Sequence, residues 1–229
     1  MIARGSQPAA AAALAHVLAV VVALVVGLGL GACQDNVSTP FPPGLEPFID
    51  GDVPGDLAAP DGEALATSTS SEGMIRAYGR GLVLAPPAAV WAAAKIPELM
   101  IARCNTDRHA VMLDNEPEHE LSFVVHYVVN DILTVEWDDQ WRGDVVTGTA
   151  GAPRLVMIRH QKVQGSDFIS VSEGSILIRA TSDRDTTELW FVEHLRAISG
   201  STDQVIGGMR DNYDALVALV HEQPLPACR

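Results

Sequence analysis

In the second half of the chain, segments rich in Val, Ile, Phe and Tyr, or with hydrophobic residues at every second position, have patterns typical of β-strands. For example, Leu133, Val135 and Trp137 alternate with polar residues. Short polar segments such as 164–167 and 182–185 separate these stretches. Consecutive strands joined by short turns form an antiparallel meander. Strands are predicted over residues 75–84, 119–130, 133–146, 154–163, 168–181 and 186–198.

Two other regions have the spacing of helices. Pro86 and Pro87 precede an alanine-rich segment to residue 94, which predicts a short helix that begins at the prolines, with a second short helix over residues 98–103. Near the C-terminus, Ser201 and Gln204 resemble a capping box, the signature of a helix start. Residues with helical spacing follow it and predict an amphipathic helix over 202–220: Val205, Met209, Tyr213, Leu216 and Val220.

The longest apolar run lies at the N-terminus, where residues 9–30 are almost entirely Ala, Val, Leu and Gly and follow Arg4. A charged start, an apolar run and small residues before a cut site make up an export signal. Leu30-Gly31-Ala32-Cys33 resembles the lipobox of bacterial lipoproteins. That resemblance implies an acylated Cys33 that anchors the mature protein to a lipid bilayer. The alternative is an uncleaved transmembrane anchor, since the run is long enough to span a bilayer.

Both interpretations place the remainder of the chain outside the cytoplasm. Gln34 after the cysteine resembles the sorting pattern of lipoproteins that reach the outer membrane. We therefore expect an exported, membrane-anchored lipoprotein at the outer membrane, facing the periplasm or the cell surface.

Residues 33–73 are rich in Pro, Gly, Ser and acidic residues, and such low hydrophobicity does not support a packed core. This segment is predicted to be an extended tether. The alternative is that a short hydrophobic element around Phe41, Leu45 and Phe48 docks on the domain. The expected organisation is a signal peptide over 1–32, the tether over 33–73, a folded domain over 74–222 and a tail over 223–229.

The formal net charge of −14 argues against nucleic acid as a partner, because an acidic surface repels phosphates. The chain has three cysteines. If Cys33 is acylated, Cys104 and Cys228 remain as a pair in an oxidising compartment, where we expect a disulfide. The alternative is that these two cysteines are unrelated.

The order of predicted elements resembles the START-like helix-grip superfamily (SRPBCC), which includes polyketide cyclase/dehydratase-like proteins. The likeness is carried by residues 82–91, a strand that runs through a proline turn into a helix, and by residues 174–198 with the helix that follows. It implies an α+β helix-grip fold: a curved antiparallel sheet wrapped around a long C-terminal helix, with a short helical pair after the first strand.

The resemblance also implies a cavity between the sheet and the C-terminal helix that takes an apolar or amphipathic small molecule. Gly207 and Gly208 in that helix fit a need for small residues at close packing or at the cavity entrance. The alternative for the large aromatic residues is plain core. The residues expected to line the cavity are Trp91, Phe123, Trp137, Phe191, Met209 and Tyr213.

Four polar strand residues are candidates for catalysis: Glu193, His126, His160 and His194. Because side chains alternate along a strand, Glu193 shares a face with apolar neighbours, and an acid in such surroundings can act as a general acid or base. The alternative is that each position is an exposed or paired residue of the sheet. These residues lack local metal-ligand spacing, and no dinucleotide or phosphate-loop motif occurs, so we expect neither metal nor cofactor.

Three functions remain open at this point. The first is binding of a hydrophobic ligand. The second is a cyclase- or dehydratase-like enzyme that uses Glu193 or a strand histidine as base. The third is an interaction scaffold without a cavity. A cavity with apolar walls and a few polar groups would favour ligand binding over a scaffold.

Overall fold

The computed structural model describes residues 57–71, 73–101, 104–113, 116, 118–130 and 133–228. The expected signal peptide, Cys33, the hydrophobic element around Phe41 and most of the tether lie outside these residues. Within the described part of the chain, none of the helices combines the length and hydrophobicity that crossing a bilayer requires.

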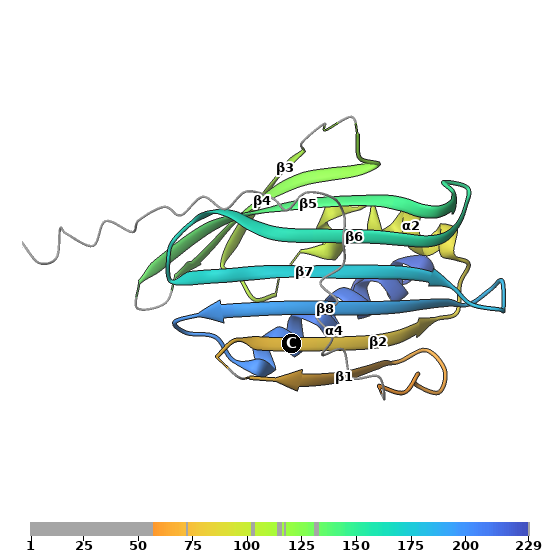
Figure 1. The fold of residues 1–229 in the computed structure, drawn as a ribbon, viewed down its shortest axis with the longest axis horizontal. Helices are drawn as coiled ribbons and strands as arrows, with labels where there is room; N and C mark the ends of the chain where they lie inside the picture. Colours follow the sequence, from red (N-terminus) through yellow and green to blue (C-terminus); the bar gives the residue numbers. More distant parts are fainter. Residues whose placement is uncertain are drawn as a thin grey trace, which may run out of the picture. The chain divides into compact units, whose positions relative to one another are not determined.

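The described strands form one antiparallel sheet with the order β1-β2-β8-β7-β6-β5-β4-β3 (Figure 1). The strands from β4 to β8 form the predicted meander, β3 extends it at one edge by pairing with β4, and β8 pairs with β2. The strand bounds are β1 Leu65–Ser70, β2 Ile75–Val83, β3 Arg108–Leu113, β4 Leu121–Asn130, β5 Thr134–Thr149, β6 Ala152–Gly165, β7 Ile169–Ala180 and β8 Thr187–Ala197.

Two strands were not predicted, and both lie at edges of the sheet. β1 has the sequence LATSTS and falls inside the segment expected to be a tether, so the sheet begins before the expected domain start at residue 74. β3 is almost entirely exposed and pairs only with β4. Edge strands such as these are held by backbone pairing with one neighbour, which leaves little apolar alternation in the sequence.

Three described helices complete the fold: α2 Pro87–Ala94, α3 Pro97–Met100 and α4 Thr202–Val220. α2 and α3 follow β2, so the helical pair comes after the second described strand rather than the first. α4 begins at the predicted capping box, with Ser201 accepting a hydrogen bond from the Gln204 backbone. α2 and α4 lie on one face of the sheet, here called the helix-side face (Figure 1). This arrangement confirms the predicted α+β helix-grip fold.

Close packing between α4 and β2 depends on two glycines. A Cβ on Gly79 would collide with Met209 Sδ, and one on Gly81 would lie 2.7 Å from Tyr213 Cε2. The register of β2 with β8 is regular, so these glycines do not mark a β-bulge. They make room for side chains of the terminal helix.

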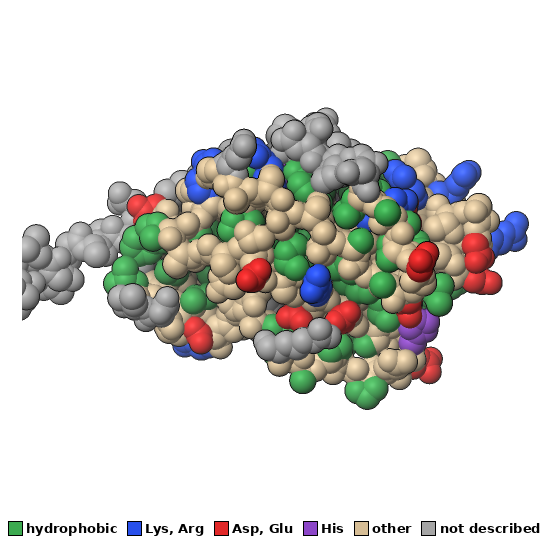
Figure 2. Space-filling view, turned by 90° about the horizontal axis from the view of Figure 1, so that it is seen from below, with side chains coloured by type: hydrophobic (Ala, Val, Ile, Leu, Met, Phe, Trp, Pro, Cys, Tyr) green, Lys and Arg blue, Asp and Glu red, His purple; other side chains and the backbone are tan. Residues whose placement is uncertain are grey.

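The hydrophobic core fills the space between the helix-side face and the helices. Trp91, Phe123, Phe191 and Leu216 are among its almost fully buried side chains. A disulfide joins Cys104, in the loop after α3, to Cys228, in the tail after α4. At the surface seen from below in Figure 2, acidic side chains are spread among hydrophobic ones.

Candidate ligand cavity

A cavity of about 240 Å³ lies between the helix-side face of the sheet and the N-terminal half of α4. Strands β4 to β8 form its wall on one side, and residues of α3, α4 and the loop around Asn105 line it on the other. Its lining is largely apolar and includes Tyr127, Trp137, Trp141, Phe168, Leu195 and Met209.

Two polar side chains, from strands on either side of β7, meet inside this cavity. Glu193 of β8 is opposite Gly174 of β7, which in turn is opposite His160 of β6, so the three residues form a row on one face. His160 Nε2 lies 3.1 Å from each carboxylate oxygen of Glu193. A Cβ on Gly174 would overlap His160 Nε2 and lie 2.7 Å from Glu193 Oε2. The glycine therefore allows a contact between two strands that are not neighbours.

Aromatic rings continue the row on the other side of His160. Trp141 of β5 is opposite His160, and the two rings stack with centroids 4.2 Å apart. Phe123 of β4 stacks on Trp141 at 5.5 Å. The imidazole is thus held between an indole and a carboxylate, which fixes the direction of its ring nitrogens.

Asp139 completes the polar part of the cavity. It lies two residues before Trp141 on the same face of β5, and its Oδ2 is 4.0 Å from His160 Nδ1. Burial raises the pKa of the Asp139 carboxyl to about 7. Burial opposes charge on His160 as well, but the carboxylates of Glu193 and Asp139 outweigh it and raise the pKa of His160. The cavity floor therefore holds groups that can exchange protons near neutral pH.

Of the six residues expected to line a cavity, two do so and four lie elsewhere. Trp137 and Met209 do line it. Trp91, Phe123, Phe191 and Tyr213 do not, and they lie in the packed core instead. The physical reason is that the rest of the helix-side face is filled. Trp91 of α2 packs against Gly143, and the Tyr213 hydroxyl donates a hydrogen bond to the Leu82 carbonyl.

Of the four candidates for catalysis, two lie together in the cavity and the other two pair with acidic residues on the opposite face of the sheet. His160 and Glu193 meet in the cavity. His194 borders the cavity, but its ring pairs with Glu173 on the opposite face, with Nδ1 3.3 Å from Oε1. His126 is away from the cavity, and its Nδ1 lies 2.7 Å from Asp138 Oδ1.

Asp139 was missed in the sequence. Asp139 is two residues from Trp137 and from Trp141, so alternation along the strand could have placed it on the same face as these two aromatic residues. The adjacent Asp138 lies on the other face, and the sequence alone does not tell which of the two carboxyl groups faces the cavity. In the described part of the chain, no group of three or more His, Cys, Asp or Glu side chains is placed to hold a metal ion.

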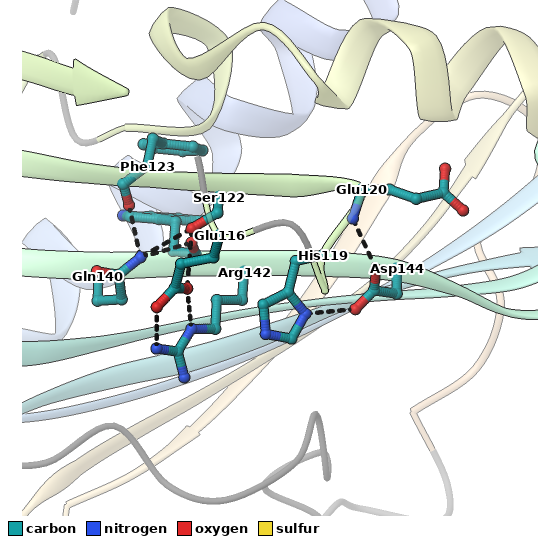
Figure 3. A network of polar contacts seen from close by, with 9 residues as sticks. Glu116, His119, Glu120, Ser122, Phe123, Gln140, Arg142 and Asp144 are labelled. Carbon is teal, nitrogen blue, oxygen red and sulfur yellow. Dashed lines mark hydrogen bonds and ion pairs between the residues drawn. The ribbon is translucent and has the colours of Figure 1, made fainter. Parts of the chain in front are cut away.

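A second polar network lies outside the cavity, where the segment before β4 meets β5 (Figure 3). Arg142 donates two hydrogen bonds to the Glu116 carboxylate, at 2.6 and 2.7 Å, and these hold the pKa of Glu116 below its ordinary value. His119 Nδ1 lies 2.7 Å from Asp144 Oδ2. Both contacts join the segment before β4 to β5, so we interpret the network as structural.

No protein-family model matches this chain, and no curated protein matches it in sequence. Solved structures do match the fold. The lipid transfer and protein localization domain of human StarD13 is 12% identical with a TM-score of 0.47, covering 72% of this chain and 88% of that chain. The Zhui aromatase/cyclase from Streptomyces sp. R1128 is 14% identical with a TM-score of 0.45, covering 65% and 94%.

Truncated norcoclaurine synthase from Thalictrum flavum is 12% identical with a TM-score of 0.45, covering 69% of this chain and 98% of that chain. Identities this low, with TM-scores under one half, carry no argument about ligand or activity. The ligand and the activity are therefore inferred from the residues of the cavity.

Proposed function

We propose that this domain binds an apolar or amphipathic small molecule between α4 and the helix-side face of the sheet. The observation that carries the proposal is the cavity of about 240 Å³, with mostly apolar walls and a few polar groups gathered at Asp139, His160 and Glu193. Ligand sites are concave and mostly apolar, with a small number of placed polar groups. An interaction scaffold needs no such space, so the cavity favours a binding protein over a scaffold.

An enzyme is the second candidate, and one observation favours it. His160 and Asp139 are buried in the cavity, and the pKa of Asp139 is about 7, which suits a group that takes up and releases a proton at neutral pH. Under this alternative, a cyclase- or dehydratase-like reaction would use His160, Glu193 or Asp139 as general base. Chemical change of a bound ligand, absent in a His160→Gln variant, distinguishes the enzyme from a carrier.

We further propose that the protein is exported and anchored to a membrane by acylation of Cys33, at the outer membrane. The support comes from the sequence: the apolar run before Leu30-Gly31-Ala32-Cys33 and the acidic, proline-rich segment after it. A disulfide between Cys104 and Cys228 is in keeping with an oxidising compartment. In this setting the domain holds its ligand next to the bilayer.

Extraction of the purified full-length protein tests the binding function. Organic-solvent extracts of the wild type and of Met209→Trp, purified identically, are compared by mass spectrometry. We expect a small molecule that is enriched in the wild-type extract, because the larger side chain occupies the cavity. Identical extracts, together with no uptake of an added apolar dye by the wild type, would overturn the proposal.

A further inference from the structure

Several buried polar atoms of residues at the cavity floor have no hydrogen-bond partner within bonding distance among the described residues. They include Asp139 Oδ1, His160 Nδ1 and Trp141 Nε1. Trp137 Nε1 is another, and it is near enough to Asp139 to lower the pKa of that carboxyl. Asp139, His160 and Trp141 are only 4%, 5% and 3% exposed. Buried polar groups in folded proteins are almost always hydrogen-bonded, and an exception needs an explanation. These three residues line the cavity, but each of these atoms exposes less than 1 Å², so a polar group of a ligand reaches them when the side chains turn toward the cavity.

The charges around the cavity decide which polar group fits. Two carboxyl groups, of Asp139 and Glu193, line it, and no Lys or Arg is among the described residues that do. Lys162 lies opposite Asp139 on β6, but its ammonium donates to the backbone carbonyls of Ser166 and Ile169. His160 is the one basic side chain of the row, and Glu193 already pairs with it.

From these contacts we infer that the ligand carries a hydrogen-bond-donating head, a hydroxyl or an amine, which sits against Asp139 and Trp141. The inference rests on the proposed binding function. A hydroxyl accepts from the Trp141 indole N–H and donates to Asp139 Oδ1, and an ammonium donates to the carboxylates. A carboxylate or phosphate head would face two acidic groups in a site of low dielectric, where repulsion between like charges is strong. An anionic head such as that of a fatty acid or a phosphate ester is therefore disfavoured, most strongly above about pH 7, where the Asp139 carboxyl is also charged.

The walls determine the body of the ligand. Tyr127, Trp137 and Phe168 give the cavity aromatic surfaces, and flat rings stack favourably on these. The ring faces of Trp141 are already covered by His160 and Phe123. A cavity of about 150 Å³ with apolar lining holds one benzene ring. At about 240 Å³ this cavity has room for a somewhat larger ring system. An aromatic alcohol or amine is the ligand class that fits both the floor and the walls.

Four naphthalene compounds that differ only in the head group test this inference. They are 1-naphthylmethylamine, 1-naphthalenemethanol, 1-methylnaphthalene and 1-naphthoate, each used to displace the dye N-phenyl-1-naphthylamine from the full-length protein. We expect the amine and the alcohol to bind about tenfold more tightly than methylnaphthalene, since hydrogen bonds to charged groups are worth roughly that factor. Naphthoate should bind more weakly than methylnaphthalene.

The outcomes separate this inference from the proposed function. Equal affinities for all four compounds, or a preference for naphthoate, would overturn the head-group assignment and leave the binding function intact. Failure of the protein to bind the dye and all four compounds would overturn the binding function and this inference with it.

A matched pair of variants locates the head group. Asp139→Asn should remove most of the preference for the amine and leave the affinity for methylnaphthalene unchanged. Asp138→Asn is the control, because Asp138 has the same chemistry one residue away but pairs with His126 outside the cavity. Retention of the full amine preference in Asp139→Asn would contradict the placement of the head group at Asp139.

Discussion

His160 Nε2 and the Glu193 carboxylate lie 3.1 Å apart across an intervening strand, and the residue between them is Gly174. Most side-chain pairs in a sheet join adjacent strands, because a side chain on the middle strand blocks longer contacts. Because Gly174 has no side chain, the side chains of His160 and Glu193 can meet above it. The pair fixes the imidazole direction at the cavity floor, and it links β6 to β8 in addition to their backbone pairing with β7.

Gly174→Ala should separate this pair. The added Cβ would overlap His160 Nε2, so the side chains must move, and overpacking of this kind costs about 1–3 kcal/mol of unfolding free energy. Urea denaturation measures the loss. Gly151→Ala is the control, because no atom lies within 4 Å of a Cβ at that position. Equal stability of the two variants would contradict the role assigned to Gly174.

The protonation of the cavity floor predicts how stability depends on pH. The pKa of Asp139 rises from its ordinary 3.8 to about 7 in the folded protein, and the pKa of His160 is raised as well. Both groups therefore bind protons more tightly when folded, and their contribution to stability falls as pH rises. For Asp139 that loss spans about pH 4 to 7. Glu193, Glu173 and Lys162 are the other charged groups that act on this pair.

Asp139→Asn isolates the effect, since asparagine stays neutral at every pH. Relative to the wild type, the variant should gain unfolding free energy between pH 5 and pH 8, as measured by denaturant titration at both values. Titrating groups that do not act on Asp139 are common to both proteins and cancel in the difference. His160 loses the contribution of Asp139 to its raised pKa in the variant, and this changes the difference in the same direction. If instead the unfolding free energy of the wild type rose relative to that of the variant between pH 5 and pH 8, burial would not be raising the pKa of Asp139.

The disulfide should stabilise the loop that borders the cavity. Cys104 precedes Asn105, which lines the cavity and donates a hydrogen bond to the Gln204 carbonyl. For a loop closed by cysteines 124 positions apart, the chain-entropy model predicts a loss of roughly 4–5 kcal/mol in Cys104→Ser. Thermal unfolding measures this loss, and peptide mapping without reductant should find the linked pair. Two free thiols in exported protein would contradict the prediction.

Acylation at Cys33 predicts that Cys33→Ser abolishes incorporation of a labelled fatty acid and releases the protein from the membrane fraction. Cys104→Ser keeps the lipobox and should be labelled as the wild type is. Normal labelling and membrane retention of Cys33→Ser would rule out a lipoprotein and leave the uncleaved anchor as the alternative.

The elements with strong local patterns were predictable from the sequence. The alternation around Trp137 indicated a strand, and the Ser201–Gln204 capping box marked the start of α4. β1 has no such signal, because its Thr and Ser residues depend on pairing with β2.

The site was less predictable, because its residues meet through strand register. The pair of His160 and Glu193 depends on two consecutive registers with a glycine between them. Whether Trp91 or Trp137 lines the cavity depends on where α2 packs, which no local pattern specifies. Asp139 lies at a register irregularity between β5 and β6, so simple alternation does not determine its surroundings there.

The most direct test of the ligand cavity is binding of N-phenyl-1-naphthylamine to the full-length protein and to two variants with the same substitution. Met209→Trp fills the cavity, whereas Met112→Trp adds the same group at a position that is 48% exposed. We predict dye binding by the wild type and Met112→Trp, and at least a tenfold loss, about 1.4 kcal/mol, in Met209→Trp. Unchanged binding by a folded Met209→Trp, or no binding by the wild type, would contradict a ligand cavity beneath α4.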